Sequence, residues 1–225
     1  METGESDLVI RRMLHDLRAC VRALRDLPDW IKEDMAEAGL NLPEMTRESL
    51  DLLSENALRL DRYMIDLHSY ARAGGTRTAG EVDVAAAWAQ LTKDMEIPDR
   101  VQIDLDFQTA VLPVEAQDFA ALLRILIENA LRHHDRSDPH IRISTMQTGG
   151  CSRLVVEDDG AGIALEFHEK IFGFLEKLAA RSAVPGSGVG LATARRLCSG
   201  HGGTIHVENA APRGARFVSA FSRPD

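Results

Sequence analysis

The stretch VEDDGAGI, residues 156–163, runs from an apolar strand pattern into a turn that holds two aspartates and two glycines. Glycine adopts backbone conformations that are closed to other residues, so a glycine-rich turn lets backbone N–H groups come close to a ligand. A second stretch, GSGVGLATARRL, residues 186–197, opens a helical pattern, and helix starts favour phosphate for the same reason. Each stretch alone is weak, because ordinary turns also need glycine. The pair together predicts a site for a phosphate-bearing ligand.

A polar cluster on an otherwise apolar helix pattern precedes both stretches and reads ENALRHH, residues 128–134. The amide oxygen of Asn129 is of a type that binds magnesium. Arg132 and His133, about one turn further along the same helix, can hold phosphate oxygens. Simple solvation of a helix surface is the alternative explanation for all three residues.

The sequence around these stretches mixes strand and helix patterns. Apolar residues alternate with polar ones over 101–107, as in a half-buried strand. Further patterns predict helices over 118–134 and 188–199, and strands over 141–145, 154–157, 204–209 and 215–221. This mixture predicts a two-layer α/β sandwich over residues 81–225.

Two heptad patterns occupy the N-terminal third of the chain. The first comprises Ile10, Leu14, Leu17, Val21 and Leu24, and the second comprises Leu50, Leu53, Ala57, Leu60, Met64, Leu67 and Ala71. Such seams are typical of helices packed at a shallow angle, and the segment 28–43, which begins and ends with proline, contains the reversal between them. We predict a helical hairpin over residues 1–73, joined to the sandwich by a glycine-rich linker over 74–80. The regular seams favour dimerisation into a four-helix bundle over a hairpin that lies against its own chain.

Composition and charge exclude several classes of protein. Hydrophobic residues make up 44% and charged residues 27% of the chain, as in ordinary soluble globular proteins. The 26 basic and 35 acidic side chains give a formal net charge of −9, which disfavours nucleic acid as a partner. No apolar run approaches the ~18 residues that a membrane span needs, and Cys20, Cys151 and Cys198 lack metal-ligand spacing. We expect a cytoplasmic protein with reduced cysteines and no membrane span in this chain.

Several motifs together resemble a known family. ENALRHH, DDGAGI, GSGVGLA and HGGTI occur in the order and spacing of the ATP-binding domain of histidine kinases, which shares a superfamily with the ATPases of type II topoisomerases and Hsp90. Upstream, MLHDLR at residues 13–18 resembles the phospho-accepting box of the same kinases, and IDLHSYARAG at residues 65–74 looks like the end of the second dimerisation helix in phytochrome-like kinases. The resemblance implies the catalytic core of a two-component sensor histidine kinase, and it covers almost the whole chain.

This resemblance implies a role for each candidate residue. His15 would receive the γ-phosphoryl group of ATP, and Asp16 would orient its ring. Asn129 would bind the Mg²⁺ that bridges the ATP phosphates, and Asp158 would accept a hydrogen bond from the adenine amino group. Further nucleotide contacts are implied for Arg132, His133, Gly160, Gly162, Lys177, Gly186, Gly188 and Gly190. The phosphoryl group would then pass to an aspartate in the receiver domain of a response regulator.

The chain departs from the family pattern at a few positions. Cys20 stands where a proline is usual, Ile125 where a second asparagine is frequent, and Leu175 where a second phenylalanine is usual. Family members that also dephosphorylate their partner carry threonine or asparagine four residues after the histidine, and here that position is Ala19. None of these departures removes an implied adenine or phosphate contact.

Two other functions remain open on the sequence. The first is a histidine phosphotransfer protein with a weak or degenerate ATP-binding domain, whose signature would be lost glycine-rich stretches. The second is a serine kinase or mechanical ATPase of the same superfamily, which would lack a heptad hairpin that carries a histidine. Both glycine-rich stretches and the hairpin histidine are present.

Overall fold

The computed structural model describes residues 2–74, 80–178 and 186–222, without the side chains of residues 2–12 and 14–16. Contacts between residues divide the chain into two compact units, Met1–Arg72 and Ala73–Asp225. The predicted linker lies mostly outside the described residues and stays a prediction.

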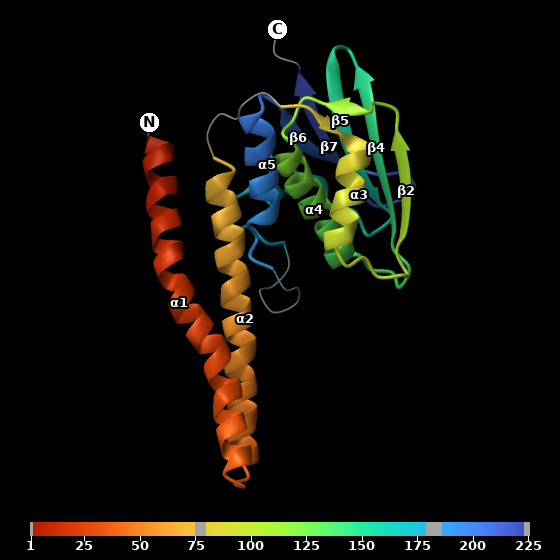
Figure 1. Cartoon of the computed structure of the whole chain (residues 1–225). Helices are drawn as coiled ribbons and strands as arrows, with labels where there is room; N and C mark the ends of the chain where they lie inside the picture. Colours follow the sequence, from red (N-terminus) through yellow and green to blue (C-terminus); the bar gives the residue numbers. More distant parts are fainter. Residues whose placement is uncertain (1, 75–79, 179–185, 223–225) are drawn as a thin grey trace. The chain divides into compact units, whose positions relative to one another are not determined.

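The first unit is a helical hairpin of α1, Glu2–Glu37, and α2, Glu44–Arg72 (Figure 1). Helix α1 continues through Pro28, so the reversal is confined to residues 38–43 and is shorter than the sequence predicted. Proline removes one hydrogen bond from a helix interior and usually ends the helix. Here Pro28 is buried, and it lies seven residues after Val21, where the heptad places its next seam residue. Packing of the proline ring therefore offsets the missing N–H.

The hairpin buries most of one row of its heptad seam and exposes most of the other. Val21, Ala57 and Met64 are buried, at first positions of their heptads. At the second position, Leu67 packs against Val21 and Met64. The four other described leucines at that position keep between 41% and 48% of their surface exposed; they are Leu17, Leu24, Leu53 and Leu60. A large apolar side chain gains free energy by leaving water. The exposed row is therefore a surface that this unit leaves uncovered.

The second unit is built on a five-stranded mixed sheet with strand order β2–β4–β5–β7–β6. The strands are β2 Gln102–Phe107, β4 His140–Thr148, β5 Cys151–Asp158, β6 Thr204–Asn209 and β7 Ala215–Ser222. Strands β2 and β4 are parallel, whereas the other neighbours are antiparallel. A separate pair is formed by β1, Val82–Asp83, and β3, Val111–Leu112.

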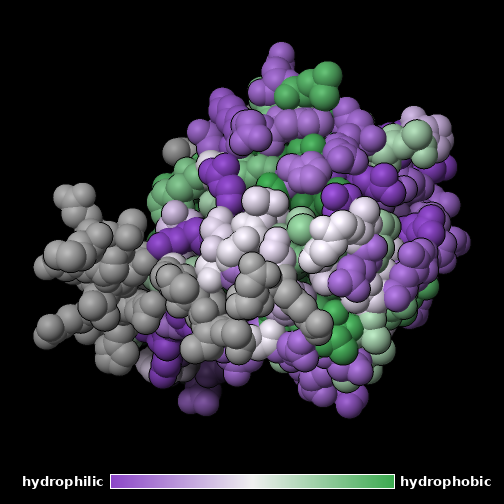
Figure 2. All heavy atoms as spheres, turned by 90° about the horizontal axis from the view of Figure 1, so that it is seen from above, coloured by the Kyte–Doolittle hydropathy of each residue, from purple (hydrophilic) through white to green (hydrophobic). Residues whose placement is uncertain are grey.

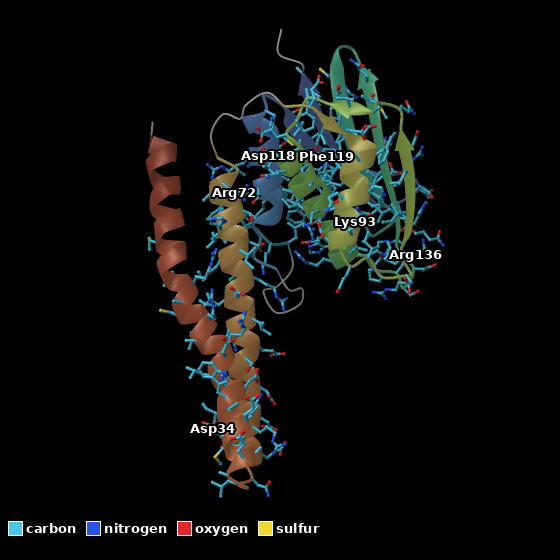
Figure 3. The ribbon with its side chains drawn as sticks, viewed as in Figure 1. Asp34, Arg72, Lys93, Asp118, Phe119 and Arg136 are labelled. Carbon is cyan, nitrogen blue, oxygen red and sulfur yellow. The ribbon has the colours of Figure 1, made fainter. Side chains whose placement is uncertain are left out.

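Helices α3, α4 and α5 lie on one face of this sheet (Figure 1). Their bounds are Val84–Asp94, Ala116–His133 and Gly190–Gly200, and two short 3₁₀ turns, η1 Leu165–Phe167 and η2 Lys170–Phe172, precede α5. The core between helices and sheet holds fully buried side chains from α4 and the inner face of the strands, among them Phe119, Leu123, Ile127, Ile143 and Phe217. Figure 3 labels Asp118 and Phe119 near the start of α4. The predicted two-layer α/β fold class is confirmed.

Two local features set the sheet in register. Strands β4 and β5 are joined by Gly149 and Gly150, whose φ angles of 60° and 82° suit the two central positions of a tight hairpin turn. On the face away from the helices, charges of opposite sign alternate across the paired strands, and Arg216 Nε lies 2.9 Å from Glu157 Oε2. Because these side chains are charged, this face of the sheet is suited to contact with solvent.

On the face seen in Figure 2, hydrophilic side chains predominate and hydrophobic ones form small separate groups. Among the helices of the described residues, none combines the length and apolar character needed to cross a membrane.

Candidate functional site

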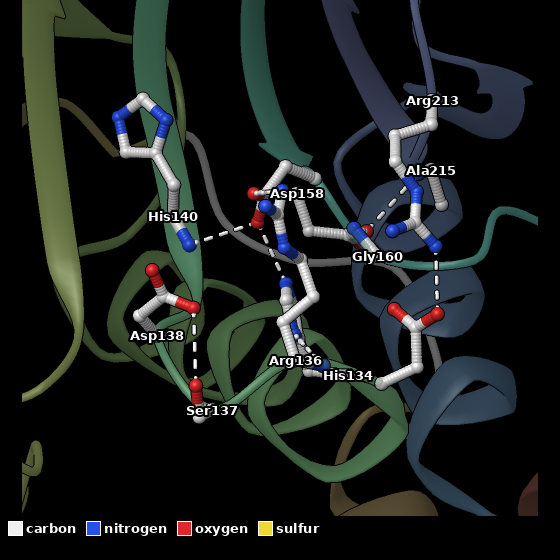
Figure 4. A network of polar contacts seen from close by, with 11 residues as sticks. His134, Arg136, Ser137, Asp138, His140, Asp158, Gly160, Arg213 and Ala215 are labelled. Atoms are coloured by element: carbon white, nitrogen blue, oxygen red, sulfur yellow. Dashed lines mark hydrogen bonds and ion pairs between the residues drawn. The ribbon is translucent and has the colours of Figure 1, made fainter.

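Asp158 ends strand β5 and is held by the backbone of two separate segments. Its Oδ1 atom accepts hydrogen bonds from the N–H of Gly160 at 2.9 Å and of Ala215 at 3.1 Å (Figure 4). Among the described residues, none donates a hydrogen bond to Oδ2. The carboxylate is thus fixed in orientation by one oxygen, while the other oxygen can accept a hydrogen bond from a ligand.

Burial raises the pKa of the Asp158 carboxyl above its ordinary value. The two backbone N–H groups and the nearby His134 act in the opposite direction without cancelling that effect. A buried carboxylate costs free energy unless it has partners. A perturbed acid in such a position marks a functional-site candidate.

The wall beside Asp158 is shaped by glycines from two turns. Gly162 has φ of 76°, and a side chain there would lie 3.1 Å from the carbonyl oxygen of Gly214. Gly214 itself has φ of 111°, and a side chain there would collide with the backbone of Asp158. Asn209 closes this side, since its Oδ1 accepts a hydrogen bond from Ile163 N at 3.1 Å. Only glycine permits the β6–β7 turn to approach the end of β5 so closely.

The C-terminal end of α4 brings the predicted phosphate-binding side chains to the same region. Asn129 is half-buried, and Arg132 and His133 lie at the surface in the last turn. The pKa of His133 is lowered, chiefly by partial burial and also by the charge of Arg132, against the opposing pull of Asp158. His133 therefore lies within electrostatic reach of both residues. A lowered pKa favours the neutral imidazole.

The second glycine-rich stretch meets α4 and the segment after η2. A side chain on Gly186, which has φ of 154°, would lie 3.1 Å from Arg132 Nη1. A side chain on Gly188, φ 75°, would lie 2.7 Å from the carbonyl oxygen of Glu176. Gly190 differs, because it starts α5 and a side chain there would make only an ordinary 3.6 Å contact with Ile125. The first two positions require glycine, whereas the third does not.

The remaining predicted residues lie apart from these contacts, or their side chains lie outside the part of the chain that the structure describes. Lys177 is half-buried in the segment that packs beside Gly188. The backbones of His15 and Asp16 lie in α1, but their side chains are outside the described residues, so their roles stay predictions. Of the predicted residues, His133 lies within electrostatic reach of Arg132 and Asp158, while Gly160 lies against Asp158 and Gly186 against Arg132.

Several residues of the site were missed by the sequence interpretation. Asn209, Gly214 and the N–H of Ala215 come from the last two strands and the turn between them, more than fifty residues beyond Asp158. The one available signal was Gly214 between two predicted strands, which is also an ordinary place for a turn glycine. A backbone N–H carries no residue-type signal at all.

Comparison with known proteins finds similarity to histidine kinases and related ATPases. Residues 115–224 match the family described as histidine kinase-, DNA gyrase B-, and HSP90-like ATPase. The methanogenesis regulatory histidine kinase FilI of Methanothrix harundinacea is 26% identical, over 99% of this chain and 25% of that protein. The signal transduction histidine-protein kinase/phosphatase MprB of Mycobacterium tuberculosis is 27% identical, over 89% of this chain and 40% of that protein. The chain thus spans a quarter to two fifths of the length of these relatives.

Solved structures share the fold. Full-length ShkA, in complex with AMPPNP, superimposes with a TM-score of 0.70 at 18% identity, over 94% of this chain and 45% of that chain. The histidine kinase AdeS of Acinetobacter baumannii gives a TM-score of 0.59 at 20% identity, over 91% and 97% of the two chains.

Proposed function

We propose that this chain, which carries a sensor histidine kinase catalytic core with its ATPase domain at residues 115–224, transfers the γ-phosphoryl group of ATP to His15 and then to an aspartate of a response-regulator receiver domain. The supporting observations are the held Asp158 carboxylate, the glycine turns around it and the motif order of the chain. The similarity of both units to histidine kinases supports the same assignment.

The observation that carries the proposal is the arrangement of the Asp158 carboxylate. Two backbone N–H groups occupy Oδ1, so the carboxylate presents Oδ2 to its ligand, and in the ionised form that oxygen can only accept a hydrogen bond. Adenine has an amino group at the position where guanine has a carbonyl oxygen. An acceptor at Oδ2 therefore pairs with adenine and repels guanine, and a buried group left unpaired discriminates strongly between ligands.

The groups that would bind the ATP phosphates lie on the other side of the site. Arg132 and the backbone around Gly186 lie together, as expected for groups that hold a polyphosphate. A single amide such as Asn129 fits magnesium that takes most of its remaining ligands from ATP phosphates and water. Magnesium so bound would neutralise charge on the phosphates. Arg132 and His133 would orient those phosphates from the protein side.

The reaction is an exchange of one phosphorus bond for another. A neutral ring nitrogen of His15 attacks the γ-phosphorus, the P–N bond forms, and the bond to the ADP oxygen breaks. Asp16 accepts a hydrogen bond from the second ring nitrogen and so keeps the attacking nitrogen unprotonated. The P–N bond then breaks in favour of a P–O bond to the receiver aspartate.

A homodimer is proposed on the exposed half of the heptad seam. The row formed by Leu17, Leu24, Leu53 and Leu60 runs along both helices and is left uncovered by the hairpin itself. The identical row of a second copy has the complementary periodicity, which gives a four-helix bundle.

Radiolabelled ATP tests the proposal directly. Incubation with [γ-³²P]ATP and Mg²⁺ should label the full chain with an acid-labile phosphoryl group, and excess unlabelled GTP should not compete. His15→Gln should abolish labelling and leave ATP affinity unchanged, whereas Asp158→Asn should lose ATP binding. Acid-stable label, or label retained in His15→Gln, would show that phosphohistidine is not the product.

A further inference from the structure

Asp159, the neighbour of Asp158, serves a second group of contacts on the other side of the chain. Its Oδ1 lies 2.7 Å from His134 Nε2 and accepts the N–H of His140 at 2.9 Å. Its Oδ2 accepts from Arg136 Nη1 at 2.9 Å. Figure 4 shows His134, Arg136 and His140, which make these contacts, along the segment that leads from α4 into β4. One carboxylate thus joins the end of β5 to the segment that follows α4.

His134 is the deeply buried member of this group, with only 2% of its side chain exposed. Helix α4 ends at His133, and His134 turns into an extended conformation that carries its ring inward. Its Nδ1 accepts the backbone N–H of Arg136 at 3.0 Å, so Nε2 carries the proton that is donated to Asp159. Both ring nitrogens are therefore occupied by neighbours, and the ring orientation is fixed.

The charge on Asp159 is stabilised in place. Burial acts to raise the pKa of the Asp159 carboxyl, but the N–H of His140, the hydrogen bond from His134 and the charge of Arg136 together hold the pKa below its ordinary value. The carboxylate is ionised at neutral pH and remains a strong acceptor. Charge-assisted hydrogen bonds of this kind are stronger than neutral ones.

The His134 ring also lies against the turn that shapes the pocket. A side chain on Gly160 would lie 3.6 Å from His134 Cδ2 and 2.9 Å from Asp158 Oδ1. The same glycine donates its N–H to Asp158. The ring thus supports, from behind, the turn whose N–H group orients the Asp158 carboxylate.

We propose that the His134–Asp159 pair is the positioning element of the nucleotide pocket: it sets the end of α4, with Asn129 and Arg132, at a fixed distance from Asp158 on β5. Neither residue of the pair touches the nucleotide. The inference rests on the proposed nucleotide site, and it adds the pair that holds the two halves of that site in register. An error of about 1 Å between groups that bind one ligand is enough to lose most of its affinity or rate.

Calorimetric titration of the full chain with ATP and Mg²⁺ tests this role. His134→Phe fills the same space without a donor, and Asp159→Ala removes the acceptor. Each should weaken ATP affinity about ten-fold or more, the order expected for loss of a hydrogen bond to a charged group. The two single losses should not add up in the double variant, since both changes break the same His134–Asp159 contact. His134→Gln, whose amide N–H can reach the place of Nε2, should recover most of the affinity.

A second histidine–aspartate pair supplies the matched control. His140 Nε2 lies 2.9 Å from Asp104 Oδ2 on the exposed face of the sheet, where both side chains are largely in water. Asp104→Ala removes a pair of the same chemistry and should leave ATP affinity unchanged.

The outcomes separate positioning from simple stability. A fall in the number of binding sites per chain, with unchanged affinity at the sites that remain, would mean that the pair only keeps the domain folded, and the inference would be wrong. Unchanged affinity in both single variants would overturn it as well. Failure of the parent chain to bind ATP would overturn the proposed function and this inference with it.

Discussion

The Asp158 carboxylate is proposed to bind the ligand, but its burial lowers the stability of the fold. Burial raises the pKa of the Asp158 carboxyl in the folded state. The contribution of this carboxyl to the free energy of unfolding is therefore favourable below its unfolded-state pKa and is lost as pH rises through its folded-state pKa. At pH 7 the ionised carboxylate therefore destabilises the fold. Asp158→Asn keeps an oxygen for the two backbone N–H groups and removes the charge.

We expect Asp158→Asn to raise Tm at pH 7 by about 2–4 °C, the shift that ~1 kcal/mol gives in a domain of this size. The gain should shrink as pH falls through the pKa of Asp158, because the parent side chain then becomes neutral too. Thermal unfolding of both chains across the acid range measures this. An equal gain at every pH would mean that charge burial is not its cause.

Ala19 lies on α1 one turn beyond His15 and is exposed. Positions four apart on a helix share one face, so a side chain at residue 19 stands beside the phospho-accepting position. A methyl group cannot orient an attacking water, and loss of one orienting contact commonly costs about 100-fold in rate. We predict weak phosphatase activity towards a phosphorylated regulator and a clear increase in Ala19→Thr. Phosphate release measured with ADP present checks this, and rapid release by the parent chain would contradict it.

The segment that leads into α5 contains Gly188, where neither the backbone conformation nor the neighbouring atoms leave room for a side chain. Gly188→Ala forces a positive φ on alanine, at about 1–2 kcal/mol, and places its side chain 2.7 Å from the Glu176 carbonyl oxygen. We expect a lower Tm and weaker ATP binding. Gly190→Ala, two residues along, meets only ordinary contacts and should keep the parent Tm. Equal losses in the two variants would remove the steric explanation.

Helices α4 and α5 are tied at their far ends by a buried pair. His201 Nε2 lies 2.9 Å from Asp118 Oδ2, and the side chains are only 3% and 8% exposed. Asp118→Ala leaves the histidine buried without this acceptor, and we predict a loss of about 2–4 kcal/mol in the free energy of unfolding. Glu208→Ala, which breaks the exposed pair with His206, should change it by less than about 0.5 kcal/mol. Urea unfolding of both variants provides the measurement.

Strong periodicity made some elements predictable and others not. Helix α4 and strands β5, β6 and β7 follow their apolar patterns to within a few residues of the predicted bounds. Helix α3 was missed, because its alanine-rich sequence has little periodicity and its clearest signal is one residue, Asp83, which caps the helix by accepting from Ala86 N at 2.8 Å. The end of α1 was placed too early, because Pro28 normally stops a helix but here packs into the seam.

For the whole molecule, the uncovered row of leucines predicts the state of association. Leu24→Glu with Leu60→Glu puts charge into the proposed bundle core and should give monomers in analytical ultracentrifugation. Leu58 has the same exposure as Leu60 but lies outside the seam, so Leu58→Glu should leave the dimer intact. A parent chain that is monomeric at all concentrations would contradict the proposed four-helix bundle.

The sequence predicted the motif side chains of the candidate site but not the distant groups that support them. Asp158 and the glycines beside it stand in one motif, so the sequence alone placed them together. Asn209, Ala215 and His134 make their contacts only once β7 is paired with β5 and α4 is packed on the sheet. No local sequence pattern predicts these long-range contacts. Long-range pairing therefore determines which groups support the site, whereas local sequence determines which side chains the site offers to a ligand.

The edge position of β2 has a consequence for the order in which the chain acquires its structure during synthesis. Its one partner in the sheet is β4, which begins at His140, after the whole of α4. The β4–β5 hairpin closes over Gly149 and Gly150 alone, so its contacts form with little loss of chain entropy. We expect the hairpin to form first on the ribosome and β2 to join it afterwards. In pulsed hydrogen exchange, the amides of Gln102–Phe107 should gain protection later than those of the hairpin.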